Sequence, residues 1–300
     1  MKSDFLRSVD HYENFPVASF LLPKSIRKPI IDVYNFARLA DDIADEGNNS
    51  SEERLRLLKI FENVLKNENI SSNFNTLIEK NIFFTSRKLK ESLTDLNVNL
   101  NYAHDLLNAF KYDSSFSPFL TWNALDNYCQ NSANPIGRIL LSIMNTQKSL
   151  KKKISPEILQ NSDLICSGLQ IINFSQDAKK DISKNRITYP KEICPKSIKE
   201  FNKEEFESLS MIEKNKLTRS MANMGLNKLK LGKELPLQIK RSNINYKYRF
   251  ALEISLTLQC GIEIAKKLLK NPSSVWEKPP KISKFTLPKL LIVSTINLIN

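Results

Sequence analysis

The chain has 300 residues and a formal net charge of +13, with 41% of its residues hydrophobic and 26% charged. This composition is ordinary for a globular protein and excludes the disordered, collagen-like and fibrous classes. Only 6 glycines occur, fewer than glycine-rich nucleotide loops or sheets with many tight turns require, so we expect an all-α fold.

Apolar residues at helical spacing predict a series of long helices. The predicted helices span residues 24–46, 51–66, 89–110, 122–144, 156–184, 214–235 and 247–269. The fourth is expected to bend near Pro135, because proline disrupts a helix interior. Segment 189–206 is expected to connect two helices. No repeat or linker divides the chain, so we predict a single domain over residues 1–300 that ends in a basic and apolar tail, 278–300.

Cysteine and histidine usage argues against a zinc site. The four cysteines are scattered and only two histidines occur, so no pair has the spacing of zinc ligands. Free thiols in a chain of this size suit a reducing compartment. Residues 1–8 contain no apolar segment typical of a signal peptide, and the longest apolar stretch, 290–299, is too short and too polar to span a bilayer. We therefore expect a cytoplasmic protein.

The excess of lysine has two interpretations. In the simpler interpretation the lysines are solvated surface residues. In the more specific interpretation they attract nucleic acid, anionic lipid or a diphosphate substrate. Aromatic and basic residues are not interleaved as in nucleic-acid platforms, so we expect no nucleic-acid partner. The tail 278–300 could rest on the inner face of an anionic membrane, or it could form a final helix packed on the bundle, which we favour.

Two acidic residues continue an inward-facing stripe in the first predicted helix. Asp41 and Asp45 lie four residues apart and share the face that carries Tyr34 and Ala37. Like charges at this spacing repel, and desolvated carboxylates are costly unless they are paired or bind a metal. Arg38 lies on the same side, three residues before Asp41. The pattern therefore places two carboxylates and a cation together.

A second polar stripe follows the fifth predicted helix. It consists of Gln170, Asn173, Asp177 and Asp181, at steps of 3, 4 and 4 residues, while the other sides of this helix are apolar. Arg186 follows five residues after Asp181. The stripe thus repeats the spacing of the first acidic pair and also has an arginine nearby.

Two such pairs indicate metal-assisted diphosphate chemistry. A single acidic pair usually marks a solvated helix face, but two pairs would bring four carboxylates together if their helices face each other. Oxygen ligands select Mg²⁺ or Mn²⁺, and Mg²⁺ typically bridges carboxylates to substrate phosphate. Neutralising a diphosphate makes it a better leaving group, and Arg38 and Arg186 would add positive charge to it. The remaining carbocation requires a dry apolar cavity, which an all-α chain can supply.

Four groups of residues resemble the squalene/phytoene synthase family. They are His11 to Pro16, Tyr34 to Asp45, Tyr128 to Arg138, and Asn173 to Arg186. The resemblance runs from about residue 11 to residue 284 and implies a helical bundle of the isoprenoid synthase type with a central active-site cavity. Segments 13–19 and 132–138 are most similar to the hydroxysqualene synthase branch of bacteria.

The resemblance implies roles for individual side chains. The implied Mg²⁺ ligands are Asp41, Asp45, Asn173, Asp177 and Asp181, and the four aspartates are implied to be catalytic. The residues implied to bind substrate are Asn14, Phe15, Tyr34, Arg38, Gln170 and Arg186, of which Tyr34, Arg38 and Arg186 would contact diphosphate. Tyr128 is implied to be catalytic near the reacting carbons, and a core tyrosine with a bonded hydroxyl is the alternative.

The implied reaction converts presqualene diphosphate and water to hydroxysqualene and diphosphate in squalene and hopanoid biosynthesis, with Mg²⁺ or Mn²⁺ and without NADPH. Expected partners are a prenyl diphosphate substrate, a peripheral membrane contact and neighbouring enzymes of the squalene pathway. Gln176 stands where reductive squalene synthases typically carry arginine, which argues against condensation. Two alternatives stay open: condensation of two farnesyl or geranylgeranyl diphosphates to presqualene diphosphate, squalene or phytoene, and a non-catalytic assembly or binding factor of the same fold.

Overall fold

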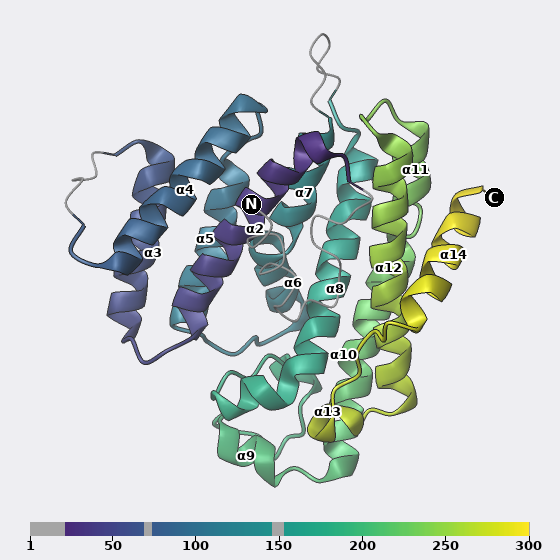
Figure 1. The fold of residues 1–300 in the computed structure, drawn as a ribbon. Helices are drawn as coiled ribbons and strands as arrows, with labels where there is room; N and C mark the ends of the chain where they lie inside the picture. Colours follow the sequence, from purple (N-terminus) through teal and green to yellow (C-terminus); the bar gives the residue numbers. More distant parts are fainter. Residues whose placement is uncertain (1–21, 69–73, 146–152, 300) are drawn as a thin grey trace.

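The computed structural model describes residues 22–68, 74–145 and 153–299, so the predicted substrate-binding residues Asn14 and Phe15 lie outside the described ranges. Every regular element within these ranges is a helix, as the composition predicts (Figure 1). In chain order the helices are α2 (Lys24–Asp45), α3 (Ser51–Lys66), α4 (Leu77–Asp95), α5 (Asn101–Ser114), α6 (Trp122–Ser132), α7 (Asn134–Met144), α8 (Pro156–Ser183), the 3₁₀ helix η1 (Lys191–Ile193), α9 (Lys203–Ser208), α10 (Met211–Leu231), α11 (Leu235–Arg241), α12 (Lys247–Lys270), α13 (Ser274–Glu277) and α14 (Thr286–Ile299).

Polar side chains fix where several helices begin. Ser50 accepts a hydrogen bond from the backbone N–H of Glu53 at 3.3 Å, so α3 begins where the sequence predicts. A capping box of Thr76 and Glu79 starts α4. Ser155 caps α8 in the same way as Ser50 caps α3. Each cap satisfies backbone donors that a helix end leaves unpaired.

Two of the predicted helices are each divided in the structure. The single helix predicted over 89–110 is wrong, because a turn at Asn97 separates α4 from α5. Asn97 has a φ of 55°, the left-handed conformation that commonly ends a helix. The helix predicted over 122–144 breaks at Ala133 instead of bending, and Pro135 falls in the first turn of α7, where its missing N–H leaves no bond unmade.

The segments predicted as a connection and a tail also contain helices. Within 189–206 lies η1, and α9 begins there at Lys203. The tail 278–300 contains α14, which packs on α12 through Leu290, so the interpretation as a final helix on the bundle is confirmed. Among the described residues, no helix is long and apolar enough to cross a membrane.

Close packing holds α8 in the bundle, with α2 in the neighbouring layer (Figure 1). The main partners of α8 are α10, α7 and α12, whereas α2 packs mainly on α4 and α5. The axes of α8 and α10 approach closely at Gly168 and Gly225, where a Cβ on either residue would lie 2.9 Å from the carbonyl oxygen of the other. Ile171 and Ile172 of α8 are fully buried. This packing fixes the helix that carries the second acidic motif.

Candidate active site

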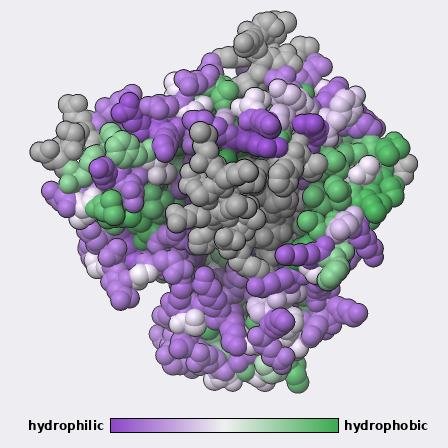
Figure 2. All heavy atoms as spheres, in the orientation of Figure 1, coloured by the Kyte–Doolittle hydropathy of each residue, from purple (hydrophilic) through white to green (hydrophobic). Residues whose placement is uncertain are grey.

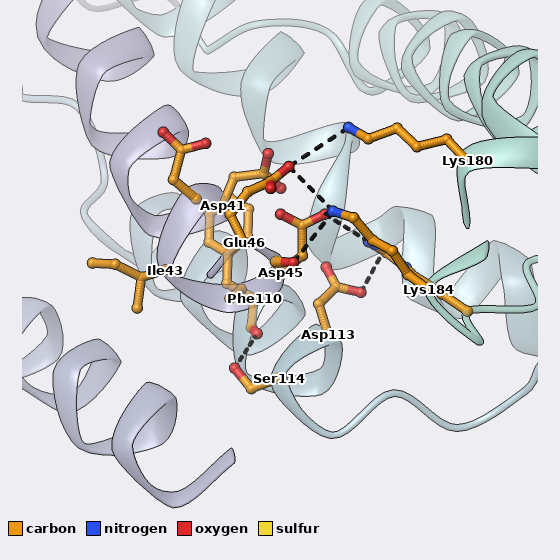
Figure 3. A network of polar contacts seen from close by, with 12 residues as sticks. Asp41, Ile43, Asp45, Glu46, Phe110, Asp113, Ser114, Lys180 and Lys184 are labelled. Carbon is orange, nitrogen blue, oxygen red and sulfur yellow. Dashed lines mark hydrogen bonds and ion pairs between the residues drawn. The ribbon is translucent and has the colours of Figure 1, made fainter. Parts of the chain in front are cut away.

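The carboxyl-terminal ends of α2 and α8 meet at the candidate site (Figure 3). Lys184, directly after α8, places its Nζ 3.3 Å from Oδ2 of Asp45 and 3.1 Å from Oε1 of Glu46. Lys180 lies one turn earlier and reaches the same Glu46 carboxylate at 3.6 Å. These ion pairs join the two helix ends that carry the acidic motifs, so the motifs face one another.

The turn that ends α8 returns Arg186 to the site. Asn185 has a left-handed φ of 58°, and its N–H donates to the carbonyl of Ile182 at 2.9 Å. The N–H of Arg186 donates to the carbonyl of Asp181, also at 2.9 Å. This pair of bonds is a Schellman motif, whose left-handed residue asparagine tolerates better than most residues. As a result, Nη1 of Arg186 lies 3.7 Å from Oδ2 of Asp45.

Sequence reasoning missed a buried acid of this site, Asp113 on α5. Its Oδ1 accepts a hydrogen bond from Nη2 of Arg186 at 2.8 Å, and its Oδ2 accepts one from the hydroxyl of Tyr128 at 2.8 Å. The side chain is only 3% exposed. A signal was present, because Asp113 continues the buried stripe of Leu106 and Ala109, but the helix predicted there stopped one turn short.

Aromatic rings surround Arg186 and Tyr128. The ring centroid of Tyr128 lies 5.2 Å from that of Phe119 and 5.8 Å from that of Phe174. The guanidinium carbon of Arg186 lies 5.3 Å from the centroid of Phe116 and 5.7 Å from that of Phe174, within range of cation–π attraction. The hydroxyl of Tyr128 thus has a partner inside the core, and a catalytic role for it stays a prediction.

The acids of the site are only partly neutralised. Burial, together with the charges of Asp45 and Asp113, raises the pKa of Asp41 to about 7. Because 42% of the Asp41 side chain is exposed, solvent screens part of this repulsion. Burial raises the pKa of Asp181 to about 7 and that of Asp113 to about 6, although Arg186 opposes both shifts. The cluster therefore has room for a further positive charge.

The available donors suit a hard divalent cation. Asn173 is half-buried on α8, and its Oδ1 has no hydrogen-bond partner within the described ranges. Asp177, one turn later, is an exposed residue of α8. Partial desolvation of its carboxylate raises its pKa, and the charges of Lys180 and Lys281 lower it. As the side chains stand, no three acidic, histidine or cysteine residues of the described part are placed to hold a metal ion. The oxygen donors fit Mg²⁺ in kind, and they would have to close around it.

An apolar cavity of about 330 Å³ lies beside the acidic motifs. Its wall includes Tyr34 and Ala37 of α2 and Leu169 of α8. Asp41 lies about one helical turn beyond Ala37, and Asn173 about one turn beyond Leu169. The same two helices therefore line the cavity along one part of their length and carry the acids on the next part.

Two further side chains that are predicted to bind substrate, Arg38 and Gln170, lie on α2 and α8. Arg38 pairs within its own helix, with Asp42 at 2.6 Å and with Asp41 at 3.7 Å. Gln170 is half-buried on α8 and does not belong to the cavity wall. Contact of either side chain with a substrate stays a prediction.

Comparisons with known proteins show which family the chain resembles. The model of the squalene/phytoene synthase family matches residues 9–286 of the chain. The hydroxysqualene synthase of Sinorhizobium fredii is 30% identical over 265 residues, which cover 87% of this chain and 81% of that protein. The hydroxysqualene synthase of Zymomonas mobilis is 36% identical over 182 residues, which cover 60% of this chain but only 56% of that relative.

A solved structure shows the same fold. The squalene synthase from Alicyclobacillus acidocaldarius superposes with a TM-score of 0.67 at 22% identity, and the match covers 89% of this chain and 92% of that one. At this identity the likeness establishes the fold of the chain and not its reaction.

Proposed function

The chain belongs to the squalene/phytoene synthase family, and on that premise we propose that it is a hydroxysqualene synthase. It would convert presqualene diphosphate and water to hydroxysqualene and diphosphate. The hydroxysqualene synthases among its relatives support this choice of reaction within the family. A prenyl diphosphate is the substrate class that the family implies.

One observation carries the proposal: α2 and α8 pass from an apolar cavity into a cluster of carboxylates. A substrate with long hydrocarbon chains and a diphosphate group needs both surroundings side by side. Tyr34 and Leu169 would contact the hydrocarbon, and Arg186 would contact the diphosphate. The aromatic rings and Asp113 hold the guanidinium in place for that contact.

The proposed metal site lies where the two motifs meet. The proposed ligands are Asp41, Asp45, Asn173, Asp177 and Asp181. Mg²⁺ bound there would supply positive charge to the diphosphate and make it a better leaving group. The raised pKa values of Asp41 and Asp181 support this assignment, because a cation among these acids would offset both the burial of their charges and their mutual repulsion.

The proposed reaction balances without a redox partner. When the carbon–oxygen bond of the substrate breaks, the electron pair leaves with the diphosphate. The carbocation meets mainly hydrocarbon side chains in the cavity wall, so few nucleophiles compete for it. A water oxygen then forms the new carbon–oxygen bond and releases a proton. Because no hydride is consumed, NADPH is not expected.

Gln176 supports this reaction over condensation of two prenyl diphosphates. Its side chain is 1% exposed, and its Nε2 donates to the carbonyl of Pro280 at 2.6 Å. It therefore faces the segment after α13 and brings no cation that could hold a second diphosphate.

A paired incubation with Mg²⁺ tests the proposal. One sample receives presqualene diphosphate and the other farnesyl diphosphate, each with and without NADPH, and mass spectrometry identifies the products. We expect hydroxysqualene from presqualene diphosphate only, in amounts that NADPH does not change. Presqualene diphosphate or squalene made from farnesyl diphosphate would assign condensation instead, and no product in either sample would favour a non-catalytic role.

A matched pair of variants tests the site. Asp113→Asn keeps an acceptor for Tyr128 but removes the charge that pairs with Arg186 at 2.8 Å. We expect kcat to fall roughly 10- to 100-fold, with KM less affected, because a positioning residue is lost. The control is Asp95→Asn, at an exposed position at the end of α4. Equal activities of the two variants would remove Asp113 from the proposed site.

A further inference from the structure

The outer face of α14 is more apolar than its inner face. The inner stripe consists of Leu290, Ser294 and Leu298, which are buried. The large exposed apolar residues of this region are Leu287, Leu291, Ile292, Ile296 and Ile299, with Phe285 just before the helix. Helices on the surface of globular proteins normally show the opposite arrangement, with polar residues outward. The isoleucines therefore indicate a partner for the outer face.

The inner stripe of α14 packs on α12 and reaches α11, while the outer face stays uncovered in the described part of the chain. Leu290 packs with Leu256 and Cys260 in a small cluster of its own. Beside it, the hydroxyl of Ser255 donates to the carbonyl of Ser294 at 3.4 Å. Figure 2 shows hydrophobic surface on the side of the molecule where α14 lies in Figure 1. Exposed patches of this kind mark sites of interaction with proteins or membranes.

Positive charge surrounds this apolar face. The segment 278–300 contains Lys278, Lys281, Lys284 and Lys289, and it contains no acidic residue. At the other end of the helix, Lys240 donates to the carbonyl of Leu298. In a symmetric pair of chains these lysines would face their own copies and repel. An anionic surface would instead attract them.

The length of α14 distinguishes lying on a membrane from crossing it. Its 14 residues correspond to about 21 Å of helix, whereas a hydrocarbon core is about 30 Å thick. A helix with one apolar face and flanking lysines can lie in the headgroup region with its apolar side toward the acyl chains.

We propose that α14, together with Phe285, is a docking surface for an anionic membrane. Ile292 and Ile296, which are 61% and 50% exposed, lie on the side that enters the lipid. Lys284 and Lys289 lie near the phosphate groups. The proposal stands on this face alone and does not depend on which reaction the chain catalyses.

Vesicle flotation with the full chain tests this surface. The vesicles consist either of phosphatidylcholine alone or of phosphatidylcholine with phosphatidylglycerol. We expect binding to the anionic vesicles that weakens in high salt and is much lower on neutral ones. The double variant Ile292→Asp/Ile296→Asp should bind the anionic vesicles at least about tenfold more weakly, because two apolar side chains that would enter the lipid are replaced by charged ones.

The control variant is Ile212→Asp, which changes an equally apolar residue that is 83% exposed at the start of α10. Circular dichroism melts should show that all variants remain folded. The proposal is overturned if the double variant binds like the unchanged chain, if the control loses binding to the same extent, or if the chain binds no vesicle. Light scattering would then show whether a dimer that depends on Ile292 covers the face instead.

Discussion

Asp181 is held where its own charge is unfavourable. Burial and the charges of Asp177 and Asp45 raise its pKa to about 7 from an ordinary value of 3.8, and Arg186 only partly opposes them. The side chain is 9% exposed, so solvent screens little of this effect. Between these two pH values the folded chain holds a proton that the unfolded chain has lost. The contribution of Asp181 to stability is therefore present below about pH 4 and is lost as pH rises to about 7.

We expect Asp181→Asn to stabilise the metal-free protein at pH 8. Asparagine has a similar shape and no charge to bury, so the free energy of unfolding should rise by on the order of 2 kcal/mol. The gain should shrink toward pH 5, because Asp181 is then neutral in the folded protein. Urea unfolding in EDTA at both pH values measures it, with Asp95→Asn as the exposed control. A loss of stability at pH 8 would contradict the argument.

The acids of the site differ in how far the sequence could predict them. Asp41 and Asp45 repeat at helical spacing, so their pattern is visible within one helix. Asp113 is a single acid whose partner, Arg186, is 73 positions away along the chain. No local period links such a pair, and only the packing of α5 near the end of α8 brings it together.

At the scale of the helices, the sequence predicts those helix ends that local capping chemistry sets. It does not predict the turns that divide a longer helical pattern. The cap at Ser50 gives the start of α3, and the polar stripe of α8 follows from spacing. The turn at Asn97 was missed because asparagine adopts a left-handed conformation only where the surrounding packing favours it. The sequence predicts no helix between 235 and 247, where α11 lies, because its seven residues give little periodicity.

The turn at Asn185 gives a prediction for an element. Its left-handed φ ends α8 and brings Arg186 to the site. Asn185→Val should cost about 1–2 kcal/mol of stability, because a branched side chain is strained in this conformation. It should also lower activity by displacing Arg186. Asn185→Gly should retain both properties, although it loses the side-chain acceptor for the N–H of Lys203 at 2.8 Å.

Measurements of the free energy of unfolding and of product formation for the two variants test this prediction. If glycine lowers activity as much as valine does, the hydrogen bond to Lys203, and not the backbone turn, positions Arg186.

On the scale of the molecule, the apolar cavity and the acidic motifs share α2 and α8, while the exposed apolar face lies on α14. The sequence predicts both acidic motifs. That the two motifs face each other could only be assumed from the sequence. Their approach depends on how α2 and α8 are placed by α5, α7 and α10, and such long-range packing leaves no local signal in the chain.

Binding of Mg²⁺ with diphosphate should stabilise the whole molecule. Diphosphate supplies oxygen ligands that the loosely placed carboxylates lack, and Mg²⁺ offsets the repulsion between the acids and the anion. At ligand concentrations about 100-fold above Kd, the gain is about 2.7 kcal/mol, which corresponds to a rise in Tm of roughly 5–10 °C. Either ligand alone should give much less. Differential scanning calorimetry measures the shift, with Mg²⁺ plus sulfate as the control.

The variant Asp181→Asn separates this site from the basic surface. If the acids bind the metal and the metal binds diphosphate, the variant should lose most of the joint shift while its own Tm without ligand stays as high or higher. The four lysines of the tail would bind diphosphate without any need for Mg²⁺. An equal shift with diphosphate alone, unchanged in Asp181→Asn, would therefore assign the anion to surface lysines and contradict the metal site.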